Sequence, residues 1–304
     1  MSRLLCLGEA VVDFVAQPPA AGLTGADRFV PSFGGSQANV AVGAARLGAA
    51  SALAGSAGRD AWGAWLRDRL QEEGVDVALY RLRDDVATTL AFVALDEAGE
   101  PQFSIWGGAS EGMLTGVEER LLEIVARETP GVIAFGSDTL IAARDRETVA
   151  ALKERGAARD WRILYDPNLR PGRWPDRDVM LEIAIEALAG VSVVKANRDE
   201  AALLTRETEP DAAGAALVAA GARQAVVTLA GEGALLAGGG ASERFPADAV
   251  DVVDATGAGD AVAAVIAAEL TRSAVIDAET LKRAMRIAGR VVGARGALTG
   301  FPRR

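Results

Sequence analysis

The strongest constraint on the fold of this chain is the regular alternation of helical and strand-like segments after residue 117. Apolar residues recur at helical spacing in some segments and form short continuous runs in others. The expected helices are 118–128, 144–156, 178–189 and 198–220, and the expected strands are 131–136, 162–166, 191–195 and 224–229. Strands separated by helices pair in parallel beneath them, so the sequence predicts an α/β fold with a mostly parallel central sheet flanked by helices.

One region interrupts this alternation. Residues 89–95 and 102–106 read as strands, and the turn 96–100 between them is typical of a hairpin. Together with part of the N-terminal segment they are expected to form a small β-sheet lid, covering about 11–32 and 85–110, that closes over a pocket and excludes water. No linker or repeat divides the chain, so residues 1–304 are predicted to form a single domain.

The composition excludes several kinds of active site. The chain has no histidine and a single cysteine, Cys6, which rules out Ser-His-Asp and Cys-His nucleophiles, His-based metal sites and Cys-rich clusters. Cys6 lies in an apolar run and is expected to be a buried structural thiol. No lysine follows a glycine, so a P-loop cannot occur. Acid–base chemistry must therefore come from carboxylates, lysine, tyrosine or water.

Charge and hydropathy limit the partners. The net charge of −10 argues against nucleic acid, because binding a phosphate backbone requires a basic face. There is no uninterrupted run of about 18 apolar residues and no signal-like start. We therefore expect a cytoplasmic protein with no membrane partner.

The stretch 251–270 combines an anion site with a carboxylate. Its small residues Gly257, Ala258 and Gly259 precede a helix, where unpaired backbone amides attract negative charge. Asp260 follows directly. Two interpretations are open: the carboxylate complements the helix dipole, or it serves as a general base beside a bound phosphate.

Polar residues also follow several predicted strands, each with a structural alternative. Asn39 either caps a helix or contacts a substrate, and Asn197 with Glu200 either forms a capping box or, through water, holds Mg²⁺. The segment 227–233 is either a plain hairpin turn or a surface for a nucleotide phosphate, and 166–171 could simply form a turn. None of these motifs is decisive alone.

Taken in order, the motifs resemble those of the ribokinase family, also called the PfkB carbohydrate kinases. They are GEAVVDF at 8–14, GGSQANVAVGAARLG at 34–48, DPNLRP at 166–171, KANRDE at 195–200, VTLAGEG at 227–233 and DATGAGDA at 254–261. The resemblance covers nearly the whole chain and is nearest to the fructokinase branch. It implies a ribokinase-like fold and an ATP-dependent sugar kinase, with fructose as the first candidate acceptor.

By this resemblance, Asp260 accepts the proton of the sugar hydroxyl and the amides of Gly257, Ala258 and Gly259 stabilise charge on the transferred group. The implied sugar-binding residues are Asp13, Gly34, Gly35, Asn39 and Arg170. The implied nucleotide-binding residues are Thr228, Gly231 and Asn197. Glu200 is implied to organise Mg²⁺ through water, and residues 294–297 resemble the family's loop for a monovalent cation, which makes K⁺ a further candidate.

Two departures from the family pattern stand out. The lid segment 104–108 lacks the arginine that fructokinases and their relatives often carry there, and Ala230 stands where glycine is usual. The alternatives therefore include kinases of 2-keto-3-deoxygluconate, ribose or a nucleoside, and a sugar-binding relative without catalysis. Because the open edge of a projecting sheet tends to be covered or paired, we predict a homodimer that forms through the lids.

Overall fold

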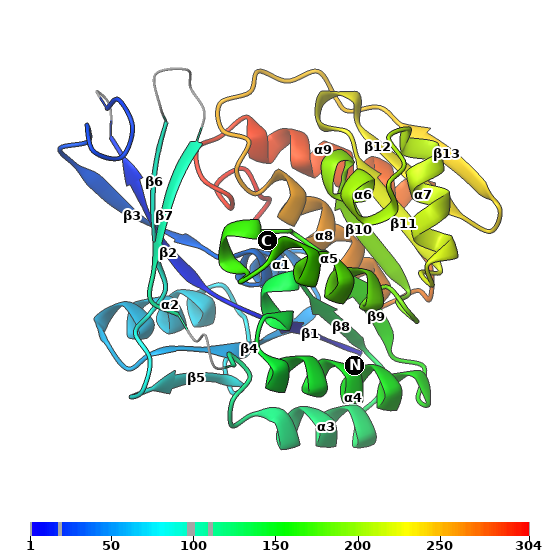
Figure 1. The fold of residues 1–304 in the computed structure, drawn as a ribbon, viewed down its shortest axis with the longest axis horizontal. Helices are drawn as coiled ribbons and strands as arrows, with labels where there is room; N and C mark the ends of the chain where they lie inside the picture. Colours follow the sequence, from blue (N-terminus) through cyan, green and yellow to red (C-terminus); the bar gives the residue numbers. More distant parts are fainter. Residues whose placement is uncertain (1, 18–19, 96–100, 109–111, 304) are drawn as a thin grey trace.

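The computed structural model describes residues 2–17, 20–95, 101–108 and 112–303. Its larger sheet has nine strands in the order β13-β12-β11-β10-β9-β8-β1-β4-β5 (Figure 1). These strands are β1 (Arg3–Leu7), β4 (Ala50–Gly58), β5 (Tyr80–Arg83), β8 (Val132–Phe135), β9 (Arg162–Tyr165), β10 (Val193–Asn197), β11 (Gln224–Thr228), β12 (Ala234–Gly238) and β13 (Ala241–Phe245). Neighbours from β5 to β11 pair in parallel, whereas β12 pairs antiparallel with β11 and β13. The predicted mostly parallel sheet is confirmed.

Helices cover both faces of this sheet (Figure 1). One face carries α1 (Ser36–Arg46), α2 (Ala61–Glu72), α8 (Ala258–Leu270) and α9 (Ala278–Val292). The other carries α3 (Glu118–Arg127), α4 (Ala143–Ala157), α5 (Arg177–Glu186), α6 (Arg198–Thr205) and α7 (Pro210–Ala219). In β8, Val132 and Ala134 pack into the first layer and Ile133 and Phe135 into the second. This two-sided burial explains why the central strands are continuous apolar runs.

The structure corrects one predicted helix and confirms one predicted turn. Residues 198–220, predicted as one helical stretch, form α6 and α7, because Arg206 ends α6 in the left-handed conformation (φ 65°) and Pro210 begins α7. The segment after β11 makes a hairpin through the short 3₁₀ helix η3 (Ala230–Glu232), so the hairpin interpretation of 227–233 is confirmed. Two further 3₁₀ helices, η1 (Ser137–Leu140) and η2 (Pro171–Arg173), lie beyond the ends of β8 and β9. Cys6 is fully buried, as expected.

A separate four-stranded sheet, which we call the lid, stands beside the main body (Figure 1). Its order is β3-β2-β6-β7, with β2 (Val11–Ala16), β3 (Phe29–Gly34), β6 (Leu90–Leu95) and β7 (Pro101–Trp106). The predicted hairpin turn at 96–100 lies outside the described residues. Phe14 stacks on Phe92 at 5.1 Å and meets Trp62 of α2 edge-on at 5.2 Å, so an aromatic cluster ties the lid to the body.

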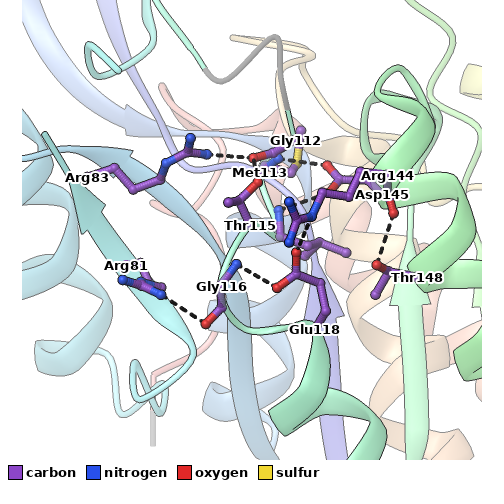
Figure 2. Close-up of polar contacts among 11 residues, drawn as sticks. Arg81, Arg83, Gly112, Met113, Thr115, Gly116, Glu118, Arg144, Asp145 and Thr148 are labelled. Carbon is purple, nitrogen blue, oxygen red and sulfur yellow. Dashed lines mark hydrogen bonds and ion pairs between the residues drawn. The ribbon is translucent and has the colours of Figure 1, made fainter. Parts of the chain in front are cut away.

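The chain that returns from the lid to α3 is fixed by buried polar contacts, shown in Figure 2. The carboxylate of Asp145, on α4, accepts hydrogen bonds from the backbone amides of Met113 (2.7 Å) and Leu114 (3.2 Å). Arg83 at the end of β5 donates to the carbonyl of Gly112 at 2.7 Å. We call Asp145 and residues 112–118 the lid anchor. It connects the lid to both α4 and β5.

Close packing of α1 on α8 positions the site described below. A Cβ atom added to Gly43 of α1 would lie 2.7 Å from the Cβ of Ala264 on α8, so only glycine permits this approach. The first turns of the two helices consequently lie side by side. None of the described helices combines the length and apolar character that crossing a membrane requires.

Candidate active site

The N-terminus of α8 offers backbone amides without a side-chain cap. Its N-cap residue Gly257 has a φ of 82°, and no side chain of the described residues caps the helix. A Cβ atom at Gly257 would lie 2.4 Å from that of Ala297, and one at Gly259 would lie 2.8 Å from the Nζ atom of Lys195. Gly257 is therefore required sterically, whereas a side chain at Gly259 would displace the end of Lys195. Uncapped amides in a glycine cradle fit an anionic phosphate group.

Asp260 faces α1 and does not cap its own helix. Its Oδ1 atom accepts from the hydroxyl of Ser36 and its Oδ2 atom from the side-chain amide of Asn39, both at 2.8 Å. The carboxylate makes no capping hydrogen bond in α8 and instead pairs across the interface with α1. Its place in the first turn of α8 also complements the helix dipole.

Ser36 was missed by the sequence analysis. It is the first residue of α1 and follows the paired glycines, so its position beside a glycine pair was the available signal. Its backbone N–H also donates to Oε1 of Glu9 at 2.9 Å. Ser36 thus links the carboxylate of Glu9 to that of Asp260.

Asn39 and Asp13 lie next to this carboxylate. Gly35 is the N-cap of α1, so the interpretation of Asn39 as a helix cap is wrong. The Oδ1 atom of Asn39 is buried without a partner among the described residues. Asp13 on β2 requires Gly34 opposite it, because a Cβ atom there would lie 2.0 Å from its Oδ2 atom. Burial and then the charge of Asp260 raise the pKa of Asp13 to about 7.

A buried ion pair lies behind the α8 N-terminus. The Nζ atom of Lys195 is 3.0 Å from Oδ2 of Asp166, and both side chains are almost fully buried. Burial alone would lower the pKa of Lys195, but the carboxylates of Asp166, Glu200 and Asp260 outweigh this and raise it. Lys195 therefore stays protonated and places a positive charge beside Gly259.

Asn197 and Glu200 form the capping box that was one of the two alternatives. Asn197 Oδ1 accepts from the Glu200 amide at 2.8 Å, and Glu200 Oε2 accepts from the Asn197 amide at 2.9 Å. Glu200 Oε1 also accepts from the amide of Leu169 at 2.8 Å. The described residues contain no group of three or more His, Cys, Asp or Glu side chains that could hold a metal ion. Both oxygens of Glu200 accept from backbone amides, so an ion near Glu200 would be held only through water.

Of the remaining predicted residues, Thr228 and Gly231 lie at or near the end of β11, and Arg170 is exposed. Thr228 pairs with Asn197 in the β10–β11 register, so both lie at the carboxyl ends of adjacent strands. Gly231 is open, with no atom within 4 Å of a Cβ added there. The neighbouring Ala230 adopts a φ of 51°, the left-handed region that glycine prefers. Arg170 is exposed and donates to the carbonyl of Leu169, so the structure does not bring its side chain to Asp260.

Comparisons with known proteins identify the family and similar folds. The model of the "pfkB family carbohydrate kinase" matches residues 1–304. A fructokinase of Salmonella typhimurium is 33% identical over 308 residues, covering 99% of this chain and 96% of that protein. The structure of aminoimidazole riboside kinase from Salmonella enterica, complexed with aminoimidazole riboside and an ATP analogue, is 28% identical with a TM-score of 0.85 and covers 99% and 97% of the two chains. That of Vibrio cholerae O395 fructokinase with fructose, ADP and calcium is 25% identical with a TM-score of 0.85, covering 99% and 96%.

Proposed function

The chain belongs to the pfkB family of carbohydrate kinases and is an ATP-dependent sugar kinase, and we propose that fructose is its acceptor. The observation that carries the kinase activity is the Asp260 carboxylate beside the uncapped N-terminus of α8, and fructose is proposed from the 33% identity to a fructokinase. A carboxylate that can accept a proton lies next to amides that can bind a phosphoryl group. Phosphoryl transfer needs this combination of positioning and charge stabilisation and requires neither histidine nor a covalent nucleophile.

In the proposed mechanism, Asp260 accepts the proton of the attacking sugar hydroxyl, while Ser36 and Asn39 hold its two oxygens in place. The amides of Gly257, Ala258 and Gly259 donate to the oxygens of the transferred group. Lys195 adds positive charge beside Gly259. Asp13, Gly34, Gly35 and Asn39 contribute to the sugar site, which the lid closes against water. Arg170 would have to turn inward from its exposed position to take part.

We propose that Asn197, Thr228 and Gly231 line the nucleotide site, because two of them share one strand edge and the third is sterically open. Glu200 would hold water around Mg²⁺, which, when bound with ATP, neutralises charge on the phosphates. For a monovalent cation such as K⁺, the candidate is the loop 294–297. Asp254 ties that loop to the entry of α8 by accepting from the amides of Gly296 and Thr256, each at 2.9 Å.

A homodimer through the lids is supported by exposed apolar side chains on one lid face. Val15, Val30, Phe103 and Ile105 are 39–62% exposed, and strand pairing places them on the face that carries Asp13. Burying such a face against a second copy would remove apolar surface from water. Light scattering at micromolar concentration tests this, and a monomer would contradict it. Because the reaction consumes ATP, we also propose a cytoplasmic location.

The test of the proposed function is ADP release with Mg²⁺ and ATP across fructose, ribose, a nucleoside and 2-keto-3-deoxygluconate. We expect the highest kcat/KM with fructose. A riboside is the second candidate, favoured by the similarity to aminoimidazole riboside kinase. Sugar binding without ADP release from any of these substrates would instead identify a non-catalytic sugar-binding protein.

A further inference from the structure

A small pocket lies between the first turn of α1 and η1, and Ser36, which contacts Asp260, is part of its lining. Its volume is about 10 Å³, and its lining includes Glu9, Ser36, Gln37, Gly136, Ser137 and Asp138. This is room for one group of the size of a water molecule. We call it the edge pocket, because it lies at the carboxyl ends of β1 and β8.

Three buried polar atoms of this lining have no hydrogen-bond partner among the described residues. They are Oε1 of Gln37, Oγ of Ser137 and Oδ1 of Asp138. Gln37 is 2% exposed and Ser137 is 0% exposed. An unpaired buried polar group costs free energy, about 1–3 kcal/mol each, and three at one place indicate an occupant that pairs with them.

Two glycines at strand ends make room for Gln37 to reach this place. A Cβ atom on Gly8, after β1, would lie 2.6 Å from the Cγ atom of Gln37. One on Gly136, after β8, would lie 3.4 Å from its Nε2 atom. Any larger residue at Gly8 would displace Gln37, so the position of its amide is set by the backbone of two neighbouring strands.

The chemistry of the lining defines the occupant. The carboxylates of Glu9 and Asp138 both border the pocket, and burial followed by the charge of Asp138 raises the pKa of Glu9 to about 7. Arg173 approaches Asp138 from one side, with Nη1 3.7 Å from Oδ2. The charge of Arg170 also acts on Asp138, and that of Arg173 on Glu9, so two arginines partly offset the two carboxylates. The three unpaired atoms are an amide oxygen, a hydroxyl and a carboxylate oxygen, so a neutral group that donates hydrogen bonds fits.

The edge pocket is close enough to the base for one small sugar to reach both. Ser36 contacts Glu9 through its backbone N–H at 2.9 Å and Asp260 through its hydroxyl at 2.8 Å. Since the N and Oγ atoms of one serine are less than about 4 Å apart, the two carboxylates are within about 10 Å of each other.

We propose that the edge pocket binds a hydroxyl of the sugar other than the one that is phosphorylated. This inference rests on the proposed function, since it deepens the description of the same site. It makes Asp138 and Gln37 residues that determine specificity. Gln37 lies within the motif at 34–48, but neither residue has a role implied by the family resemblance.

The test measures the coupling between single hydroxyls and the pocket. D-fructose and its monodeoxy analogues are compared on the wild type, on Asp138→Asn and on Gln37→Met, by kcat/KM and by calorimetric binding without ATP. On the wild type, we expect kcat/KM for one analogue to be at least about 100-fold lower than for D-fructose, because a site built to pair a hydroxyl rejects the analogue that lacks it. On either variant, kcat/KM for the same analogue should be less than about tenfold lower than for D-fructose.

A control variant completes the design. Asp211→Asn, which removes an exposed carboxylate paired with Arg244, is the control for lost charge. It should leave the ratio of kcat/KM between D-fructose and each analogue as in the wild type.

The outcomes separate the two proposals. If kcat/KM fell equally for every analogue on the wild type and on both variants, the pocket would hold only a buried water and the inference would fail. Turnover of fructose would still support the kinase function. If binding depended on one hydroxyl in the wild type but not in the variants, and no ADP were released, the role of the pocket would be supported and fructose would be refuted as the acceptor. Failure of the wild type to bind fructose would overturn the inference as stated.

Discussion

Asp145 in the lid anchor and Asp138 in the edge pocket are both buried carboxylates within ten residues of each other, yet their surroundings differ. Both oxygens of Asp145 accept backbone amides, those of Met113 and Leu114 (Figure 2). Asp138 has one oxygen 3.7 Å from Arg173 and another without a partner among the described residues. Asp145 therefore has both oxygens paired within the protein, whereas Asp138 keeps one buried oxygen with which an added group can pair.

The same contrast applies to the regions around them. In the lid anchor, Arg83, Arg81 and Thr115 donate to backbone carbonyls of residues 112–116. At the active site, no side chain of the described residues caps α8, and the Oδ1 atom of Asn39 has no partner in the described part of the chain. Substitutions in the anchor should therefore change stability, and substitutions at the site should change turnover or specificity.

The largest expected effect is on catalysis. Asp260→Asn should lower kcat by about 100-fold or more, because the amide cannot accept the proton of the sugar hydroxyl. The fold and ATP affinity should remain, as judged by thermal unfolding and nucleotide titration. Turnover close to that of the wild type would refute the assignment of Asp260 as the base.

The matching substitution in the anchor is Asp145→Ala. It should lower the free energy of unfolding by roughly 1–3 kcal/mol, since it leaves the buried amides of Met113 and Leu114 without acceptors. Urea denaturation measures this change. If kcat of the folded variant fell as far as in Asp260→Asn while stability was unchanged, the contrast between the two regions would be lost.

Two hydroxyl deletions sharpen the comparison. Ser36→Ala should lower kcat about tenfold with little change in the KM for sugar, because one of the two donors that hold Asp260 is lost. Ser36→Thr, which keeps a hydroxyl, should restore most of the activity. Thr115→Val removes a hydroxyl that donates to Gly112 in the anchor and should leave kcat unchanged. Equal effects of the two deletions on kcat would contradict a positioning role for Ser36.

Asp13 provides a test by pH. Its pKa rises from 3.8 to about 7 on folding, through burial and the charge of Asp260. The pKa of Asp13 is higher in the folded than in the unfolded state. The contribution of Asp13 to stability is therefore fully present below about pH 4 and is lost as the pH rises through 7. Between about pH 6 and 8 the wild type should lose about 1 kcal/mol more stability than Asp13→Asn. Identical slopes in urea unfolding would contradict this. The pKa of Glu9 is also raised to about 7, so the stability of Asp13→Asn should still decrease with pH, but less steeply than that of the wild type.

The smallest effect is expected at the surface of the anchor. Arg144 pairs with Glu118 at 2.6 Å, but its side chain is 62% exposed (Figure 2). Arg144→Ala should therefore cost less than about 1 kcal/mol and leave kcat unchanged. A loss as large as that of Asp145→Ala would show that the exposed pair, and not the buried carboxylate, holds the anchor.

Much of the fold was predictable because burial on both faces leaves a signature in the strands. The apolar runs at 131–136 and 162–166 correspond to β8 and β9, and the absence of a helix between 89 and 106 indicated the lid. The break at Arg206 and the antiparallel strands β12 and β13 were missed. Both depend on local conformations that periodicity does not record.

The sequence by itself determined the fold class, the family and the residue types available for catalysis, since periodicity, motifs and the lack of histidine are properties of the chain alone. Only the tertiary structure joined Ser36 and Asn39 to Asp260, more than 200 residues away. It also decided that the oxygens of Asp145 in the lid anchor have hydrogen-bond partners and that Oδ1 of Asp138 in the edge pocket has none among the described residues. Whether a polar group has a partner depends on segments that meet only when the helices pack on the sheet.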